Sequence, residues 1–339
     1  MKNRKNIFNL IIFILLFIAT IYILIQNKNS TTKVKPTDFS ISDTASIRKI
    51  FIADMKGQSV SLTKSNHHWL VNDEFPVNTS KMELLLDVLK RVEVKNPTPA
   101  SMRENVIKDM AAGAVKVEIY KKGIKPFKII YIGGPTQDML GTFMALENKR
   151  KEPYVVHLPG FNGYLSEGYF FTDINEWRSK EVFNYQPGKI KSVRVIYNGN
   201  GDSSFTLNVS GTNNFNLIQS STNEEIIPLD QQKAKSFLQA FTKLHFMSVE
   251  TDIKGFKRDS IFNSEPVITI SVTTIEDEIK SLKLFYRPSD IRTRLELFPG
   301  VDKEYFLATV SDRAGDLVVM QRLVLDRIMW KTGHFKIEK

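Results

Sequence analysis

The five histidines of the chain are the first residues to consider for metal binding or proton transfer. His67 and His68 are adjacent, and neighbouring residues of a strand point to opposite faces of a sheet. His157, His245 and His334 are scattered, and the sequence has no H-E-x-x-H pattern of the kind that binds zinc. We therefore expect structural or solvated roles for the histidines, and we predict no metal site and no cofactor.

Three short sequences could support other chemistry. Gly201-Asp202-Ser203-Ser204 contains a serine beside an acid, but it lies at a predicted hairpin tip and is not followed by an Asp and a His at a recognisable spacing. Gly133-Gly134-Pro135 could cradle an anion, but a turn that needs glycine at positive φ explains it better. Glu276-Asp277-Glu278 could bind calcium, yet its counterpart in the repeat described below is Lys121-Lys122-Gly123, a turn of opposite charge. We predict solvated turns and no catalytic residue.

Aromatic residues gather in residues 161–171, between the last predicted strand and the closing helix of the first half of the chain. Most of these rings are expected to pack in the core. Tyr164, Tyr169 and Phe170, where partly exposed, would form a contact surface for a protein or a glycan, because large rings offer contact area at a low entropic cost. These three are the predicted partner-binding residues.

The elements that must position these residues occur twice, at an offset near 152 residues. Residues 75–81 align with residues 227–233, and each segment is followed by an apolar stripe that predicts a helix with one buried face. Ser80 with Glu83 predicts a capping box at the first helix, and Asp230 predicts an N-cap at the second. The matched stripe residues are Met82, Leu85, Leu86, Leu89 and Val92 in the first half, and Ala234, Phe237, Leu238, Phe241 and Leu244 in the second.

Strand patterns flank both helices in the same order, and each half ends in a predicted short helix. On these closing helices Asp173 and Trp177 align with Asp326 and Trp330. The aligned strands are residues 50–62 with 193–207, the strands that open at Trp69 and Phe215, 115–120 with 267–272, 127–132 with 282–285, 142–146 with 294–297, and 154–158 with 305–308.

Each half is therefore a run of strands, a helix, more strands and a closing helix. This order predicts an α+β fold built on antiparallel sheets, and about 150 residues suffice for a lobe with its own core. The sequence predicts an N-terminal transmembrane helix followed by two duplicated lobes of sheet and helix. The expected domains are a transmembrane anchor at residues 1–26, a stalk at 27–43, a first lobe at 44–187 and a second lobe at 188–339.

The anchor is predicted from residues 7–25, of which fifteen are Ile, Leu or Phe. A helix of this length nearly crosses a hydrocarbon core of about 30 Å. The bulky residues that follow lack the small-x-small cleavage site of a secretory signal peptide. A short basic N-terminal tail, and the absence of cysteine from the whole sequence, favour an N-terminus in the cytoplasm and lobes outside the inner membrane.

Composition excludes several classes of protein. Without cysteine the chain has no disulfides, iron–sulfur clusters or thiol catalysis. The formal charge of +10 could suggest a nucleic-acid partner, but six of the 47 Lys and Arg residues and none of the 37 acidic residues lie in residues 1–35, which leaves +4 for the rest. That remainder shows no basic stripe with interleaved aromatics, so we predict no nucleic-acid binding.

Several short sequences in a fixed order resemble the domain-of-unknown-function 4340 (DUF4340) family over most of residues 44–250. The resemblance implies a bacterial envelope protein with a membrane anchor and no catalytic residues, in some members associated with gliding-motility-type ABC transport systems. The sequences that carry it are Val60-Ser61-Leu62-Thr63-Lys64, Trp69-Leu70-Val71, Pro76 before the Leu-rich helix, Tyr131-Ile132-Gly133-Gly134-Pro135, Tyr154-Val155-Val156 and Trp177-Arg178-Ser179-Lys180.

The sequence favours a non-enzymatic, single-pass envelope protein whose lobes bind a partner. The expected partners are the inner membrane and ABC-type transporter subunits or other envelope proteins. The first alternative is an enzyme that acts on envelope glycans or peptides in a cleft between the lobes, since paired carboxylates can meet only in the folded chain. The second is a structural spacer.

Overall fold

The computed structural model describes residues 38–66, 68–211, 214–288, 300–313 and 315–337, together with Ile14, Leu16, Phe17 and Lys35. The chain divides into two compact units, Met1–Arg178 and Ser179–Lys339, which are called the first lobe and the second lobe below. Among the described residues, no helix is both long enough and apolar enough to cross a membrane. The anchor predicted at residues 7–25 lies outside the described residues, apart from Ile14, Leu16 and Phe17.

The described part of the first lobe forms a nine-stranded antiparallel sheet in the order β4-β3-β2-β1-β6-β7-β8-β9-β5. Its strands are β1 (Lys49–Ala53), β2 (Ser59–Ser65), β3 (His68–Val71), β4 (Phe75–Pro76), β5 (Glu93–Pro97), β6 (Val115–Tyr120), β7 (Lys128–Pro135), β8 (Thr142–Leu146) and β9 (Tyr154–His157). Its helices are α2 (Thr79–Arg91), α3 (Ala100–Gly113), α4 (Ser166–Tyr169), α5 (Ile174–Trp177) and the 3-10 turn η1 (Glu147–Lys149).

The described part of the second lobe forms an eight-stranded sheet in the order β13-β12-β11-β16-β17-β18-β19-β15 and a separate pair, β10 with β14. The strands are β10 (Glu181–Phe183), β11 (Ile190–Tyr197), β12 (Phe205–Gly211), β13 (Asn214–Gln219), β14 (Leu244–His245), β15 (Ser248–Val249), β16 (Ile268–Thr274), β17 (Ile279–Pro288), β18 (Val301–Val310) and β19 (Val318–Gln321). The helices and turns are η2 (Pro187–Lys189), η3 (Gly201–Ser203), α6 (Gln231–Gln239), α7 (Phe256–Phe262), α8 (Arg322–Leu325) and η4 (Thr332–Phe335).

The two large sheets have the same strand order, with β4 as an added edge strand in the first lobe. Their registers agree as well, so the predicted duplication and the α+β class are confirmed for the described residues. The residues paired around the two central strands are Ile50 with Leu62 and Ile119, and Val193 with Leu207 and Val272.

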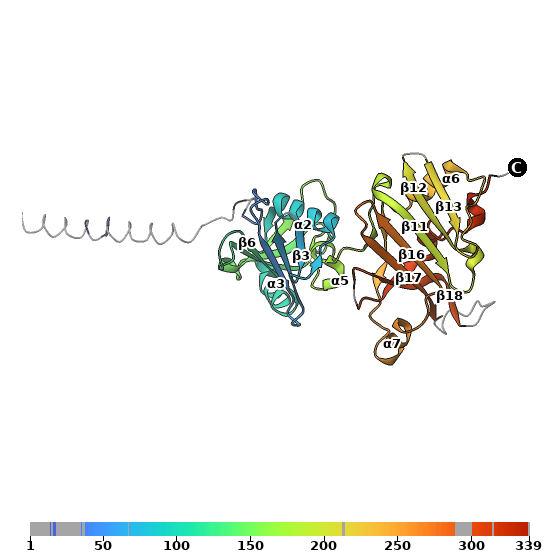
Figure 1. Cartoon of the computed structure of the whole chain (residues 1–339). Helices are drawn as coiled ribbons and strands as arrows, with labels where there is room; N and C mark the ends of the chain where they lie inside the picture. The colour runs from blue at the N-terminus through green and yellow to red at the C-terminus, as the bar shows by residue number, and fades with distance from the viewer. Residues whose placement is uncertain are drawn as a thin grey trace, which may run out of the picture. The chain divides into compact units, whose positions relative to one another are not determined.

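Helices cover both faces of the first sheet. Successive strand residues point to opposite faces, and α2 packs on one face through Met82, Leu85 and Leu89. α3 covers part of the other face through Val106 and Met110. Figure 1 shows both helices against the strands. In the second lobe, α6 buries Ala234, Phe237 and Leu238 of the predicted stripe, whereas Phe241 and Leu244 are buried beyond the end of the helix.

Gly133 and Gly134 lie in β7 and not in a turn, and neither has a positive φ. A Cβ atom on Gly133 would lie 2.8 Å from Met110 Cγ and 2.9 Å from the carbonyl oxygen of Phe143. The predicted turn was therefore wrong. Glycine is needed at position 133 because Met110 of α3 and the backbone of β8 leave no room for a Cβ atom.

The last strand pair of the second lobe differs from the prediction. β18 lies between β17 and β19 as β8 lies between β7 and β9, with matching register. Residues 305–308 are therefore counterparts of β8, not of β9, and residues 294–297 lie outside the described residues. The link from β17 to β18 is longer than that from β7 to β8, and the chain from β19 to Phe335 is shorter than that from β9 to Trp177. The second difference compensates for only part of the first, so no single offset aligns the two halves.

The first lobe includes the end of the stalk predicted at residues 27–43. Phe39 is 0% exposed and Ile41 is 2% exposed, and both belong to the core beneath α2. The backbone N–H of Ile41 donates to the carbonyl oxygen of Leu89 at 2.8 Å. The apolar residues of this segment thus draw it into the lobe.

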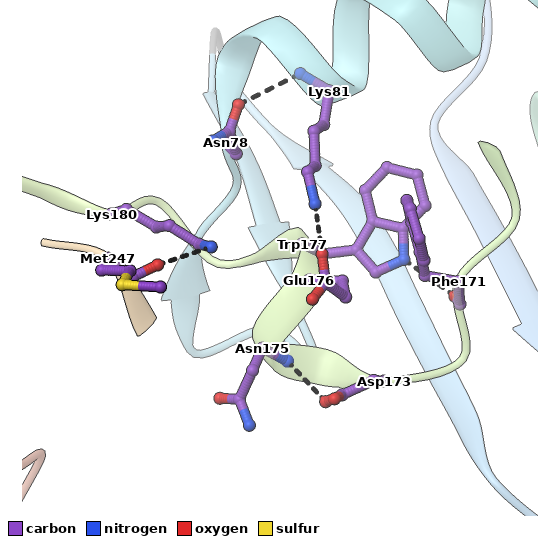
Figure 2. Close-up of polar contacts among 9 residues, drawn as sticks. All are labelled: Asn78, Lys81, Phe171, Asp173, Asn175, Glu176, Trp177, Lys180 and Met247. Atoms are coloured by element: carbon purple, nitrogen blue, oxygen red, sulfur yellow. Dashed lines mark hydrogen bonds and ion pairs between the residues drawn. The ribbon is translucent and has the colours of Figure 1, made fainter. Parts of the chain in front are cut away.

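The lobes divide between Arg178 and Ser179, before the boundary expected between residues 187 and 188. The intervening segment belongs to the second lobe because β10 pairs with β14 there. Lys180 Nζ also donates to the carbonyl oxygen of Met247 at 2.9 Å, as Figure 2 shows.

Candidate partner-binding surfaces

The aromatic segment contains the three predicted partner-binding residues. Phe170 is 4% exposed and packs in the first-lobe core, so its ring offers no contact area to a partner. Tyr169 is half-buried and packs edge-on against Phe161, with ring centroids 6.4 Å apart. Tyr164 is also half-buried. The structure therefore places the two tyrosines and Phe161, but not Phe170, where a partner could reach them.

The first lobe closes where α5 meets the start of α2 (Figure 2). The backbone N–H of Asn78 donates to the carbonyl oxygen of Trp177 at 2.7 Å. The Asn78 side chain accepts from the Lys81 N–H at 3.1 Å and so caps α2, in place of the capping box predicted at Ser80. Trp177 is 1% exposed, and its Nε1 donates to the carbonyl oxygen of Phe171 at 2.8 Å.

The second lobe repeats this junction with η4 in the place of α5. The backbone N–H of Asp230 donates to the carbonyl oxygen of Phe335 at 2.9 Å. The Asp230 carboxylate accepts from the backbone N–H groups of Gln232 and Lys233, each at 3.0 Å. The predicted N-cap at Asp230 is confirmed.

These backbone contacts identify the equivalent residues. Phe335, which is 0% exposed, takes the place of Trp177, and the predicted alignment of Trp177 with Trp330 was wrong. Asp326 lies at the end of α8 and has no counterpart on α5. The β-bridges beside the two caps, Val77 with Arg178 and Leu229 with Lys336, support the same equivalence.

The charge at the two junctions differs. Lys81 Nζ lies 2.5 Å from Glu176 Oε2 and 4.6 Å from the centre of the Phe171 ring. The equivalent residues of the second lobe are Lys233 and His334, so a histidine occupies the position of the acidic Glu176. A hollow of about 680 Å³ opens beside them, lined by Ser203, Lys233, Trp330, Lys331, Thr332, Gly333, His334, Lys336 and Ile337.

The hairpin turns between β6 and β7 and between β16 and β17 also carry opposite charges at equivalent places. Lys121-Lys122-Gly123 turns at Gly123, whose φ is 90°. In the second lobe Glu276 lies 3.4 Å from Lys189, and Asp277 lies 2.5 Å from Lys191. The prediction that both sequences are turns is confirmed.

The helices that precede these hairpins differ in what they cover. α3 has 14 residues and buries Val106 and Met110 against its sheet, whereas α7 has seven residues and buries none of its side chains fully. Phe256, at the start of α7, is 86% exposed. Ile261 of α7 is partly buried against the cluster of Phe285, Leu307, Leu317 and Val319, and Figure 1 shows α7 at the margin of its lobe.

The residues considered for catalysis or metal binding are dispersed. Among the described residues, which exclude His67, no three His, Asp or Glu side chains are grouped as metal ligands. Gly201-Asp202-Ser203-Ser204 forms the hairpin tip that includes η3. There Asp202 Oδ1 accepts from Ser221 Oγ at 2.7 Å and holds the turn.

The turn between β6 and β7 in the first lobe carries exposed apolar surface that was not predicted from the sequence. Ile124 is 97% exposed and Phe127 is 54% exposed, beside the lysines of residues 121–125. Ile124 and Phe127 could have been identified from the sequence, because they are apolar residues in a turn that was expected to be solvated. The exposure of Phe256 could not, because an apolar residue at the start of a predicted helix is equally consistent with packing on the sheet.

Two α+β lobes with one strand order, joined in a single chain, define the architectural class of this protein. The family described as "domain of unknown function (DUF4340)" matches residues 69–259, which is more than half of the chain. The chain belongs to the DUF4340 family. No curated protein and no solved structure matches the sequence significantly.

Proposed function

We propose that this chain is a non-enzymatic, membrane-anchored envelope protein whose lobes bind protein partners, as an accessory subunit of a membrane transport or surface-assembly complex. The observation that carries the proposal is the contrast between equivalent surface turns on one repeated frame. Lys121-Lys122-Gly123 and Glu276-Asp277-Glu278 occupy the same place in the two sheets and carry opposite charges.

Two lobes with the same sheet but differently charged surface turns favour a role in binding over a role in catalysis. A catalytic site requires side chains from several elements to converge on one reacting group, and their positions are then tightly constrained. Charge complementarity at a surface instead selects partners and suppresses wrong ones. The basic and acidic turns would therefore direct the two lobes to different partners.

The apolar segment at residues 7–25 supports the membrane part of the proposal. Its Ile14, Leu16 and Phe17 are helical and are 48%, 62% and 59% exposed. Apolar side chains exposed on a helix favour insertion in a bilayer. The proposed location is the inner membrane, with the N-terminus in the cytoplasm and both lobes outside it.

ABC-type transporter subunits are the proposed partners, from the resemblance to anchored members of the family. Co-purification of the full chain from mildly solubilised membranes tests the proposal. A chain whose residues 7–25 are replaced by an unrelated transmembrane helix tests whether the contact lies in the membrane. A chain in which Glu276-Asp277-Glu278 is changed to Lys-Lys-Gly tests whether it lies on the second lobe.

Specific recovery of transporter subunits, lost in one of these two variants, is the expected result. The converse change, Lys121-Lys122-Gly123 to Glu-Asp-Glu, tests the first lobe in the same way and should spare a contact that the acidic turn of the second lobe makes. Turnover of an envelope glycan or peptide by the purified chain, abolished by a change in a defined polar cluster, would overturn the proposal in favour of an enzyme.

A further inference from the structure

The turn between β6 and β7, residues 121–127, combines positive charge with exposed apolar surface; it is called the basic tip below. Ile124 is 97% exposed and Phe127 is 54% exposed. Lys121 Nζ lies 4.4 Å from the centre of the Phe127 ring, and Lys122 and Lys125 are exposed on either side of Ile124.

The basic tip lies where the chain enters the first lobe from its N-terminal segment. Lys128, at the start of β7, donates from Nζ to the carbonyl oxygens of Asp38 and Ser40 at 2.6 and 2.7 Å. The pKa of Asp43 is held below its ordinary value by hydrogen bonds from Ser46, with a smaller contribution from the positive charge of Lys121. The tip and residues 38–43 therefore share one end of the lobe.

We propose that the basic tip rests on the anionic lipid surface of the membrane that holds the N-terminal segment. Lysines near such a surface are attracted to lipid phosphates, and their aliphatic stems lie along apolar surface while the charges stay hydrated. An apolar side chain between them can enter the boundary between headgroups and acyl chains. Ile124 has this position between Lys122 and Lys125.

The distance along the chain fits this contact. Twelve residues separate Ile25, the end of the apolar segment, from Asp38. They reach at most about 45 Å when fully extended, so the first lobe stays near the bilayer and the basic tip meets lipid at a high effective concentration. This inference rests on the anchor of the proposed function.

The second lobe supplies an internal control. Its equivalent turn holds Ile275, which is 50% exposed, beside three acidic residues. Two of them, Glu276 and Asp277, are paired with Lys189 and Lys191. This turn has exposed apolar surface of the same kind but no excess of positive charge, so anionic lipid does not attract it.

The full chain reconstituted in lipid nanodiscs tests the contact, and the absence of cysteine permits labelling at a single site. An environment-sensitive dye at Ile124→Cys, with spin-labelled lipid as quencher, reports insertion of the basic tip. We expect strong quenching in nanodiscs that contain phosphatidylglycerol. Replacement of Lys121, Lys122 and Lys125 by Gln should then weaken the contact by about fivefold for each lysine.

Two controls keep the result specific. The dye at Ile275→Cys should remain unquenched, and amide hydrogen exchange of residues 121–127 in the unlabelled chain should slow only with anionic lipid. Equal quenching of the dyes at positions 124 and 275 would overturn the proposed lipid contact. Hydrogen exchange that slows only when a membrane extract is added would also overturn it, and would indicate that the basic tip binds an acidic protein. A chain that does not co-migrate with nanodiscs would refute the anchor itself, whereas co-migration with an unprotected tip refutes only this inference.

Discussion

The two lobes keep the same sheet but differ in what surrounds it. Their central strands pair in the same register, and the inward-facing pairs, such as Ile50 with Ile119 and Val193 with Val272, are buried in both lobes. Three features differ between the lobes: the buried ring of the closing segment (Trp177 or Phe335), the helix α3 or α7, and the charge of the hairpin turn. A one-residue slip in a strand would turn every buried side chain outward, so register resists change, while turns and edges can change without this cost.

The largest expected effect concerns the closing rings. Trp177→Ala and Phe335→Ala should each lower the free energy of unfolding by about 3–5 kcal/mol, because each removes a fully buried ring. Trp330→Ala should cost less, because that ring is only partly buried. Urea unfolding with hydrogen exchange read separately for peptides of each lobe measures these changes. A larger loss of stability from Trp330→Ala than from Phe335→Ala would mean that Trp330, and not Phe335, is the counterpart of Trp177.

The second largest effect on stability should distinguish α3, which packs on its sheet, from α7, whose Phe256 is exposed. Met110→Ala should destabilise the first lobe by about 2–4 kcal/mol, because it opens a cavity against β7. Phe256→Ala should change the stability of the second lobe by no more than about 0.5 kcal/mol, because the ring is exposed. The same unfolding measurement compares the two variants. A comparable loss from Phe256→Ala would mean that the ring is covered in solution.

The sequence allowed the repeated core to be predicted, but not the positions where the repeats differ in length. Buried stripes and alternating strands repeat at a near-constant spacing, and they identified the α6 stripe and the cap at Asp230. A fixed offset failed at β18 because the preceding link is longer in the second lobe, and it failed at Phe335 because the shorter closing segment compensates for only part of that length. Phe170 was misjudged because sequence does not say which rings of an aromatic run face the core.

The two helix caps should differ by a smaller amount. Asp230→Ala should cost about 1–2 kcal/mol and Asn78→Ala about 1 kcal/mol. The Asp230 carboxylate accepts two backbone hydrogen bonds and carries a charge favoured at a helix N-terminus, whereas the Asn78 side chain accepts one. Thermal unfolding of each variant measures the difference, with Ser80→Ala as a control that should have little effect. A loss at Ser80 equal to that at Asn78 would restore the predicted capping box.

Alkaline pH should weaken a contact that the second lobe does not repeat. A hydrogen bond to Glu118, followed by burial, raises the pKa of Tyr120 to about 12. The folded state therefore holds this proton more tightly than the unfolded chain, so the stabilisation is complete below pH 10 and is lost as the pH rises to 12. Burial and a hydrogen bond to Glu147 raise the pKa of Tyr131 in the same lobe to about 12 as well. Tyr120→Phe should therefore reduce this step in the pH profile of first-lobe hydrogen exchange, and Tyr120→Phe together with Tyr131→Phe should remove it. An unchanged profile would assign the step to another tyrosine.

The smallest expected effect concerns the ion pair between Lys81 and Glu176 in the first lobe. Glu176→Gln should lower the free energy of unfolding by about 0.2–1 kcal/mol, because Lys81 and Glu176 are 29% and 41% exposed and water screens them. The loss should shrink at 1 M salt, where the Debye length is about 3 Å. His334→Glu would place an acid at the equivalent position beside Lys233 and should stabilise the second lobe by a similar amount, read by urea unfolding at low and high salt. A gain that persists at 1 M salt would show that the position acts through packing, and the charge difference between the two junctions would then have no part in their stability.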